Sequence, residues 1–139
     1  MPSPTTRDLT DDEYRALAEL RYRIRRFIHF SEGAARAAGL EPHQHQLLLA
    51  IRGLHDQKAP TIAELAERLQ LAHNSTQELV RRTEQKGLIS TSRGEDDKRQ
   101  VLVELTASGQ AALRELSVAH RDELRSQASE LTSWLERLT

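Results

Sequence analysis

The stretch from Thr61 to Thr106 constrains the fold more than any other part of the sequence. Thr61 and Glu64 have the spacing of a capping box, in which two side chains satisfy free backbone N–H groups at a helix N-terminus, so we expect a helix to begin there. After a short turn over 70–72, the apolar spacing predicts a second helix over 73–86. Two helices joined in this way form a helix-turn-helix.

Two runs with strand character follow the second helix. They cover 88–92 and 100–105, and in the second run Val101, Val103 and Leu105 alternate as in a half-buried strand. The segment between the runs is a polar, charged tip with the sequence Arg93-Gly94-Glu95-Asp96-Asp97-Lys98-Arg99. A hairpin of this kind beside a helix-turn-helix is a wing, and an arginine on it is suited to enter a minor groove of DNA. The alternative is an ordinary exposed hairpin loop.

The outward face of the second predicted helix is rich in hydrogen-bonding side chains. Asparagine, glutamine and arginine read base edges in the major groove, and serine or threonine bind phosphates. The candidate DNA contacts on this helix are His73, Asn74, Ser75, Gln77, Glu78 and Arg82, and those on the wing are Arg93, Lys98 and Arg99. The alternative for the helix is a solvated polar face, which is the common meaning of such a run.

These residues resemble the MarR-type winged helix-turn-helix transcriptional regulators. The wing is similar to the family's Asp-x-Arg-x5-Leu-Thr pattern at Asp97, Arg99 and Leu105-Thr106, and the segments 65–69 and 84–89 are also similar to the family. The resemblance implies a mainly α (α+β) fold, a winged helix-turn-helix whose N- and C-terminal helices form a dimerisation domain. It also implies a homodimer that grips a pseudo-palindromic operator, with Arg99 on each wing and a recognition helix in each of two successive major grooves.

By the same likeness, Asp97 orients the wing arginine and does not itself touch DNA. The sequence departs from the family at two positions of the recognition helix, which is the helix predicted over 73–86. Arg81 stands where family members often have an acidic residue, so the groove contacts of the helix are less well defined. Thr83 stands where they often have an apolar residue, which suggests a looser inner face.

Long amphipathic segments flank the winged region. Thr10 and Glu13 form another capping box, and apolar residues then recur at three- and four-residue steps until Gly39. A similar stripe runs to the C-terminus with an irregular interval at 118–121, which predicts two helices or one kinked helix. A second copy of the chain would bury both stripes, and the alternative is a monomeric helical cap. We therefore predict a disordered lead over 1–9, dimerisation helices over 10–38 and 107–139, and a DNA-binding domain over 40–106, in one continuous architecture.

Composition narrows the classes of function. The net charge of −1 argues against a strongly basic nucleic-acid binder, so basic and acidic residues must lie on different faces. The chain has no cysteine, which removes disulfides and thiol chemistry, and no window is apolar enough to span a bilayer, so we expect a soluble, cytoplasmic protein. No catalytic or phosphate-binding motif is present, and we predict no enzyme activity and no cofactor. His43 and His45 face different sides of a helix, which is poor geometry for one metal ion.

The predicted function is sequence-specific binding of double-stranded DNA to regulate transcription. The resemblance suggests a repressor that a small ligand, often aromatic or phenolic, releases from DNA. The predicted ligand pocket comprises Arg23, Ile24, Phe27, Ile28, His29, Leu47 and Ile51. Singly, each of these residues would equally fill a core. Two other functions stay open: a winged-helix module that binds protein instead of DNA, and a metal-responsive regulator.

Overall fold

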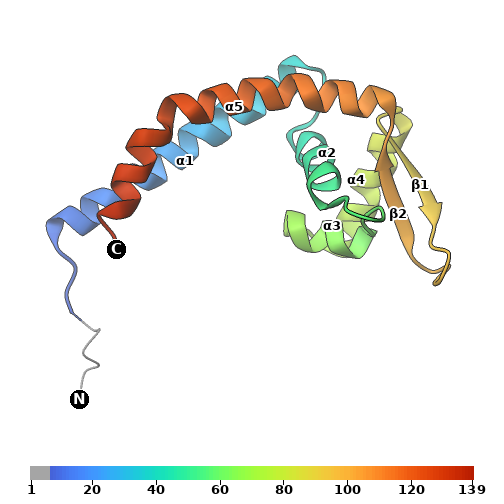
Figure 1. Cartoon of the computed structure of the whole chain (residues 1–139), viewed down its shortest axis with the longest axis horizontal. Helices are drawn as coiled ribbons and strands as arrows, with labels where there is room; N and C mark the ends of the chain where they lie inside the picture. Colours follow the sequence, from blue (N-terminus) through green and yellow to red (C-terminus); the bar gives the residue numbers. More distant parts are fainter. Residues whose placement is uncertain (1–6) are drawn as a thin grey trace. The chain divides into compact units, whose positions relative to one another are not determined.

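The computed structural model describes residues 7–139, so residues 1–6 of the predicted disordered lead lie outside the described part of the chain. The fold is mainly helical with one small antiparallel hairpin, as predicted (Figure 1). The elements in chain order are α1 (Asp11–Ala37), α2 (Pro42–Leu54), α3 (Ile62–Leu69), α4 (His73–Gln85), β1 (Ile89–Arg93), β2 (Val101–Leu105) and α5 (Ala107–Glu136).

The described residues form two compact units. One unit, here called the helical unit, contains the described residues up to Ser31 and the segment Ala119–Thr139. The other, here called the winged unit, is Glu32–Val118. Most of α1 therefore belongs to the helical unit, whereas α2, α3, α4, the hairpin and the first turns of α5 belong to the winged unit.

The winged unit is built on an apolar core to which every one of its elements contributes. The capping box predicted for α3 is present, since Thr61 Oγ1 accepts from Glu64 N at 3.1 Å and Glu64 Oε1 accepts from Thr61 N at 3.1 Å. This cap fixes where α3 begins and directs Leu65 into the core. The largest fully buried apolar side chains are Leu47, Leu48, Ile51, Leu65, Leu79, Ile89 and Val103.

The hairpin is tied to the helices at its base. Strands β1 and β2 pair from Ile89 opposite Leu105 to Arg93 opposite Val101. An isolated bridge joins Thr61 to Leu102, and Val103 N donates to Pro60 O at 3.0 Å. The segment just before α3 thus contacts the middle of β2 through one isolated bridge and one hydrogen bond, which tie the hairpin to the helix-turn-helix.

The junction between α4, the hairpin and α5 is closely packed. Thr106 Oγ1 donates to Gly87 O at 2.6 Å and accepts from Gly109 N at 3.1 Å, so one hydroxyl joins the end of α4 to the first turn of α5. Thr106 N also donates to Leu88 O at 3.1 Å. A Cβ atom at Gly109 would lie 1.9 Å from Leu88 O, so only glycine allows this approach.

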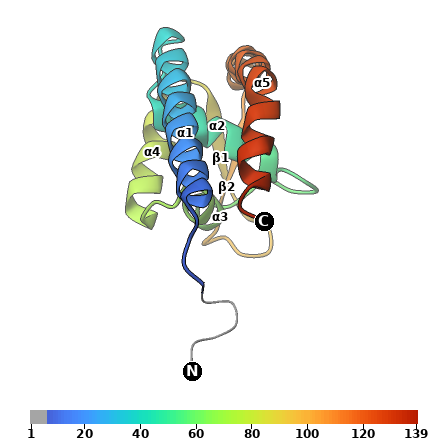
Figure 2. The same ribbon diagram turned by 90° about the vertical axis from the view of Figure 1, so that its left-hand side faces the viewer.

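In the helical unit, α1 and α5 run antiparallel, as Figures 1 and 2 both show. Arg137 near the C-terminus meets Asp12 at 3.5 Å, and Arg23 forms an ion pair with Glu130. Of the two alternatives predicted for 118–121, the structure has a single helix, because α5 runs from Ala107 to Glu136. No helix among residues 7–139 is long and apolar enough to cross a membrane.

His120 of α5 is the centre of the contacts at the other end of the helical unit. Its ring centroid lies 5.8 Å from that of Phe27 and 5.3 Å from that of Phe30, both in edge-on geometry. Its Nε2 atom is hydrogen bonded to Ser31 Oγ at 2.8 Å. Ser31 interrupts the apolar stripe of α1, and this bond gives its buried hydroxyl a partner.

The close contact between Gly109 and Leu88 O predicts that an alanine substitution has opposite effects on stability at Gly109 and at Gly33. Gly109→Ala should lower the free energy of unfolding by about 2 kcal/mol or more, because the new methyl group meets a backbone oxygen that cannot rotate away. The matched variant Gly33→Ala should instead stabilise by about 0.5–1 kcal/mol, since Gly33 is helical and has nothing within 4 Å of the new atom. Urea unfolding followed by circular dichroism measures both, and equal stabilities would contradict the packing described for α5.

Candidate nucleic-acid interface

Helix α4 has a buried inner face that includes polar side chains. Leu79 and Val80 are buried in the core, and Thr76 and Thr83 are completely buried beside them. Thr83 Oγ1 donates to Leu79 O at 2.7 Å, and Thr76 Oγ1 donates to Ala72 O at 3.0 Å. Both hydroxyls therefore have partners within the helix, and Thr83 fits at a position where an apolar residue was expected without leaving an unsatisfied group.

The outward face of α4 is exposed as predicted. Five of the six candidate contacts on this helix are exposed, and the sixth, Arg82, is half-buried. The exposed residues are His73, Asn74, Ser75, Gln77 and Glu78. The helix thus presents amide, hydroxyl, imidazole and carboxylate groups to solvent, with no large apolar side chain among them.

Two arginines on α4 are already paired with a carboxylate. Arg81 Nε donates to Glu78 Oε2 at 2.9 Å, and Arg81 Nη2 makes a further bond to Glu78 Oε1. Arg82 Nη1 lies 3.9 Å from Glu78 Oε1. The hydrogen bonds from Arg81 hold the pKa of the Glu78 carboxyl below its usual range, so Glu78 is ionised at neutral pH.

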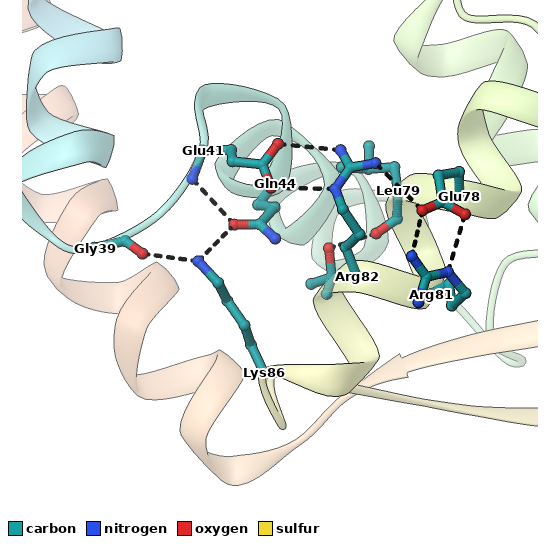
Figure 3. A network of polar contacts seen from close by, with 9 residues as sticks. Gly39, Glu41, Gln44, Glu78, Leu79, Arg81, Arg82 and Lys86 are labelled. Carbon is teal, nitrogen blue, oxygen red and sulfur yellow. Dashed lines mark hydrogen bonds and ion pairs between the residues drawn. The ribbon is translucent and has the colours of Figure 1, made fainter.

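A polar network ties the C-terminal half of α4 to the N-terminus of α2 (Figure 3). Arg82 donates to the Glu41 carboxylate through Nε at 3.2 Å and Nη2 at 3.1 Å. Lys86 Nζ donates to Gly39 O at 2.9 Å and to Gln44 Oε1 at 3.1 Å, and Gln44 Oε1 also accepts from Glu41 N at 3.0 Å. The orientation of α4 in the winged unit therefore depends on the residues that join α1 to α2.

Sequence reasoning did not assign any role to this network. Glu41 and Gln44 have the N-cap and N3 spacing of a capping box around Pro42, and that signal marks the start of α2. It does not show that the same two side chains also bind Arg82 and Lys86, which lie about forty residues further along the chain.

The wing presents its basic side chains to solvent. Arg93 ends β1 and is exposed, as is Lys98, and the side chain of Arg99 is 93% exposed. Asp97 accepts from Arg99 through Nε at 3.1 Å, Nη2 at 3.3 Å and the backbone N at 3.0 Å. These bonds hold the pKa of Asp97 below its usual range. The contact between Asp97 and Arg99 expected from the family pattern is present.

Main-chain bonds close the tip of the wing. Gly94 N donates to Gln100 O at 3.0 Å, and Gln100 N donates to Asp97 O at 3.1 Å. A Cβ atom at Gly94 would lie 2.7 Å from Asp97 O, so the turn requires glycine at this position. The backbone therefore positions Arg99 beside Asp97.

The residues of the predicted ligand pocket fall in both units. Leu47 and Ile51 are buried in the core of the winged unit. In the helical unit, Arg23 is paired with Glu130 and Phe27 contacts His120. The other three predicted pocket residues, Ile24, Ile28 and His29, are exposed on α1. Among residues 7–139, no group of three histidine, aspartate or glutamate side chains is placed to hold a metal ion.

Residues 38–100 match the model of the MarR family. A curated relative, the organic hydroperoxide resistance transcriptional regulator of Bacillus subtilis (strain 168), is 37% identical over 70 residues, which are 50% of this chain and 47% of the relative. The aligned part thus spans about half the length of that relative.

Solved structures of MarR-family regulators share the fold. AbsC from Streptomyces coelicolor matches with a TM-score of 0.73 and 22% identity over 91% of this chain and 84% of its own. The M. tuberculosis transcriptional regulator MOSR, solved in complex with DNA, matches with a TM-score of 0.60 and 27% identity over 82% of this chain and 81% of its own.

The tie between α4 and α2 predicts a stability effect at Lys86. Lys86→Met keeps most of the side-chain length but removes the donor to Gly39 O and Gln44 Oε1, so we expect the free energy of unfolding to fall by about 1 kcal/mol. The control Lys58→Met, in the exposed loop before α3, should change it by less than about 0.5 kcal/mol. Chemical denaturation of the three proteins gives both values, and equal effects at Lys86 and Lys58 would show that the network does not hold α4.

Proposed function

Since residues 38–100 form a MarR-family domain, we propose that this protein binds double-stranded DNA in a sequence-specific manner and regulates transcription. The observation that carries the proposal is the combination, in one unit, of an exposed polar face on α4 with a wing that is closed by main-chain bonds and presents Arg99. The family is one of transcriptional regulators, and we propose no catalytic role. We also propose that the protein acts in the cytoplasm, where a regulator of this kind meets the chromosome.

Each part of the interface has a separate role in this proposal. Candidate base and phosphate contacts on α4 are His73, Asn74, Ser75, Gln77, Glu78 and Arg82, and those on the wing are Arg93, Lys98 and Arg99. Amide and guanidinium groups on α4 suit the base edges of a major groove, whereas an extended arginine on a wing suits a narrow minor groove. Asp97 acts on DNA binding by orienting Arg99.

We also propose that the protein acts as a homodimer. The helical unit leaves large apolar side chains exposed on both of its helices: Tyr14, Leu17, Ile24, Ile28, Leu124 and Leu135. A second copy would cover this surface and would place two recognition helices on a two-fold operator. Sedimentation should therefore give twice the 15.8 kDa mass of one chain, and the mass of a single chain would contradict the dimer.

A protein-binding role is the second candidate, and the acidic residues of the wing favour it. Glu95 and Asp96 are exposed at the tip, and the net charge of the chain is −1. The dependence of binding on salt separates the two roles, because DNA affinity falls steeply with added salt in proportion to the number of phosphates contacted.

The wing mechanism predicts a selective loss of DNA affinity at Arg99. Arg99→Ala should weaken binding to a genomic fragment selected by the purified protein by about 1–3 kcal/mol, while the sedimentation mass stays unchanged. The control is Arg114→Ala, which removes another exposed arginine of the same unit, on α5, and should leave affinity within error. Binding is measured at one fixed salt concentration, and unchanged affinity of Arg99→Ala would exclude the wing contact.

We further propose that the protein is a repressor. A small aromatic or phenolic ligand would release it from DNA. The chain has no cysteine, so the thiol oxidation available to many peroxide sensors cannot be its signal, although one relative is named for hydroperoxide resistance. A ligand would instead act by binding one conformation more tightly than another. Millimolar salicylate or benzoate should raise the melting temperature and release DNA, and a lack of both effects would contradict these ligands.

A further inference from the structure

Three of the four arginines on α4 and the wing are paired with carboxylates of the same chain, and the fourth is Arg93. Arg81 and Arg82 contact Glu78, Arg82 also contacts Glu41, and Arg99 contacts Asp97 (Figure 3 shows the first three pairs). Each of these arginines carries its own counter-ion, which explains how a chain of net charge −1 presents several guanidinium groups on one unit.

These ion pairs change how the arginines bind the phosphates of DNA. A guanidinium bound to a carboxylate must exchange that partner for a phosphate, and the released carboxylate is then repelled by the same phosphates. The side chains of Arg81 and Glu78 are 54% and 49% exposed, so the pair is open to solvent and DNA can separate it. Non-specific binding, which depends on phosphate contacts alone, is therefore weakened by each such carboxylate.

Unlike the carboxylates of Glu41 and Asp97, that of Glu78 does not also stabilise local structure. Glu41 caps α2 and Asp97 also accepts from the backbone N of Arg99, so both support local structure. Within the described part of the chain, the Glu78 side chain is hydrogen bonded to Arg81, lies 3.9 Å from Arg82 and makes no other polar contact. It also lies on the exposed face of α4, the face proposed to meet base edges.

We propose that Glu78 is a specificity-determining residue that withholds Arg81 from phosphates on most DNA sequences. Where the carboxylate meets the N4 amino group of a cytosine in the major groove, it accepts a hydrogen bond that offsets its repulsion, and Arg81 becomes available to a phosphate. This inference rests on the proposed DNA binding. In this role Glu78 weakens binding to other DNA sequences and contacts a cytosine of the preferred sequence.

Glu78→Gln tests the proposal because it removes the charge and preserves the shape. Affinity for a 30-base-pair duplex of random sequence should rise roughly tenfold near 0.1 M salt, and the log–log salt slope should steepen by about 1, as expected for one more phosphate contact. Affinity for a selected genomic fragment should rise less, so the ratio of specific to non-specific affinity should fall. In the double variant Glu78→Gln with Arg81→Ala, most of the gain should disappear.

The matched control is Glu115→Gln, which removes an equal charge from an exposed position of α5 in the same unit. If Glu78→Gln and Glu115→Gln change random-duplex affinity and salt slope equally, the pair is only a helix-surface ion pair and the inference is wrong. That result leaves the proposed function intact if the wild type binds its selected fragment. If the wild type binds neither duplex in a salt-dependent way, the proposed function itself fails.

Discussion

The hydroxyl of Thr106 is the contact on which the winged unit depends. It bonds Gly87 at the end of α4 and caps the first turn of α5 at Gly109, so α4 and α5 meet at one side chain. The hairpin between these two helices is consequently closed at its base, and Leu88 packs directly under Gly109. Together with the bridge from Thr61 to Leu102, this closure supports a two-stranded hairpin, which alone would be only marginally stable in water.

The position of α4 is likewise fixed by contacts that its side chains make within the winged unit. Its inner threonines bond to the helix backbone, while Arg82 and Lys86 bind groups at the start of α2. Side chains on the outward face are therefore presented by a helix whose position is set at its buried side and at its C-terminal half. A site that reads base edges needs this, because an error of one ångström in the helix position moves every hydrogen-bonding group together.

Local signals in the sequence located most of the structure. The capping boxes at Thr10 and Thr61 and the helix-ending glycines Gly39 and Gly87, both with positive φ, act within a few residues, so sequence reasoning could find them. The irregular interval at 118–121 is compatible from sequence with two helices or one kinked helix, and the structure has one helix there. It coincides with the passage of α5 from the winged unit to the helical unit after Val118, so the apolar stripe changes its partner while the helix continues. The bonds that Arg82 and Lys86 make to α2 could not be predicted, because periodicity carries no information about which distant segments meet.

The way the wing tip is closed determines how such a protein can change over evolution. Its turn is held by main-chain bonds, by Gly94 and by Asp97, whereas Glu95, Asp96 and Lys98 extend into solvent. Substitutions at these three positions can therefore alter the electric charge of the tip while its shape is retained. A lineage could adapt the wing to a new operator by single surface replacements, without passing through unstable intermediates.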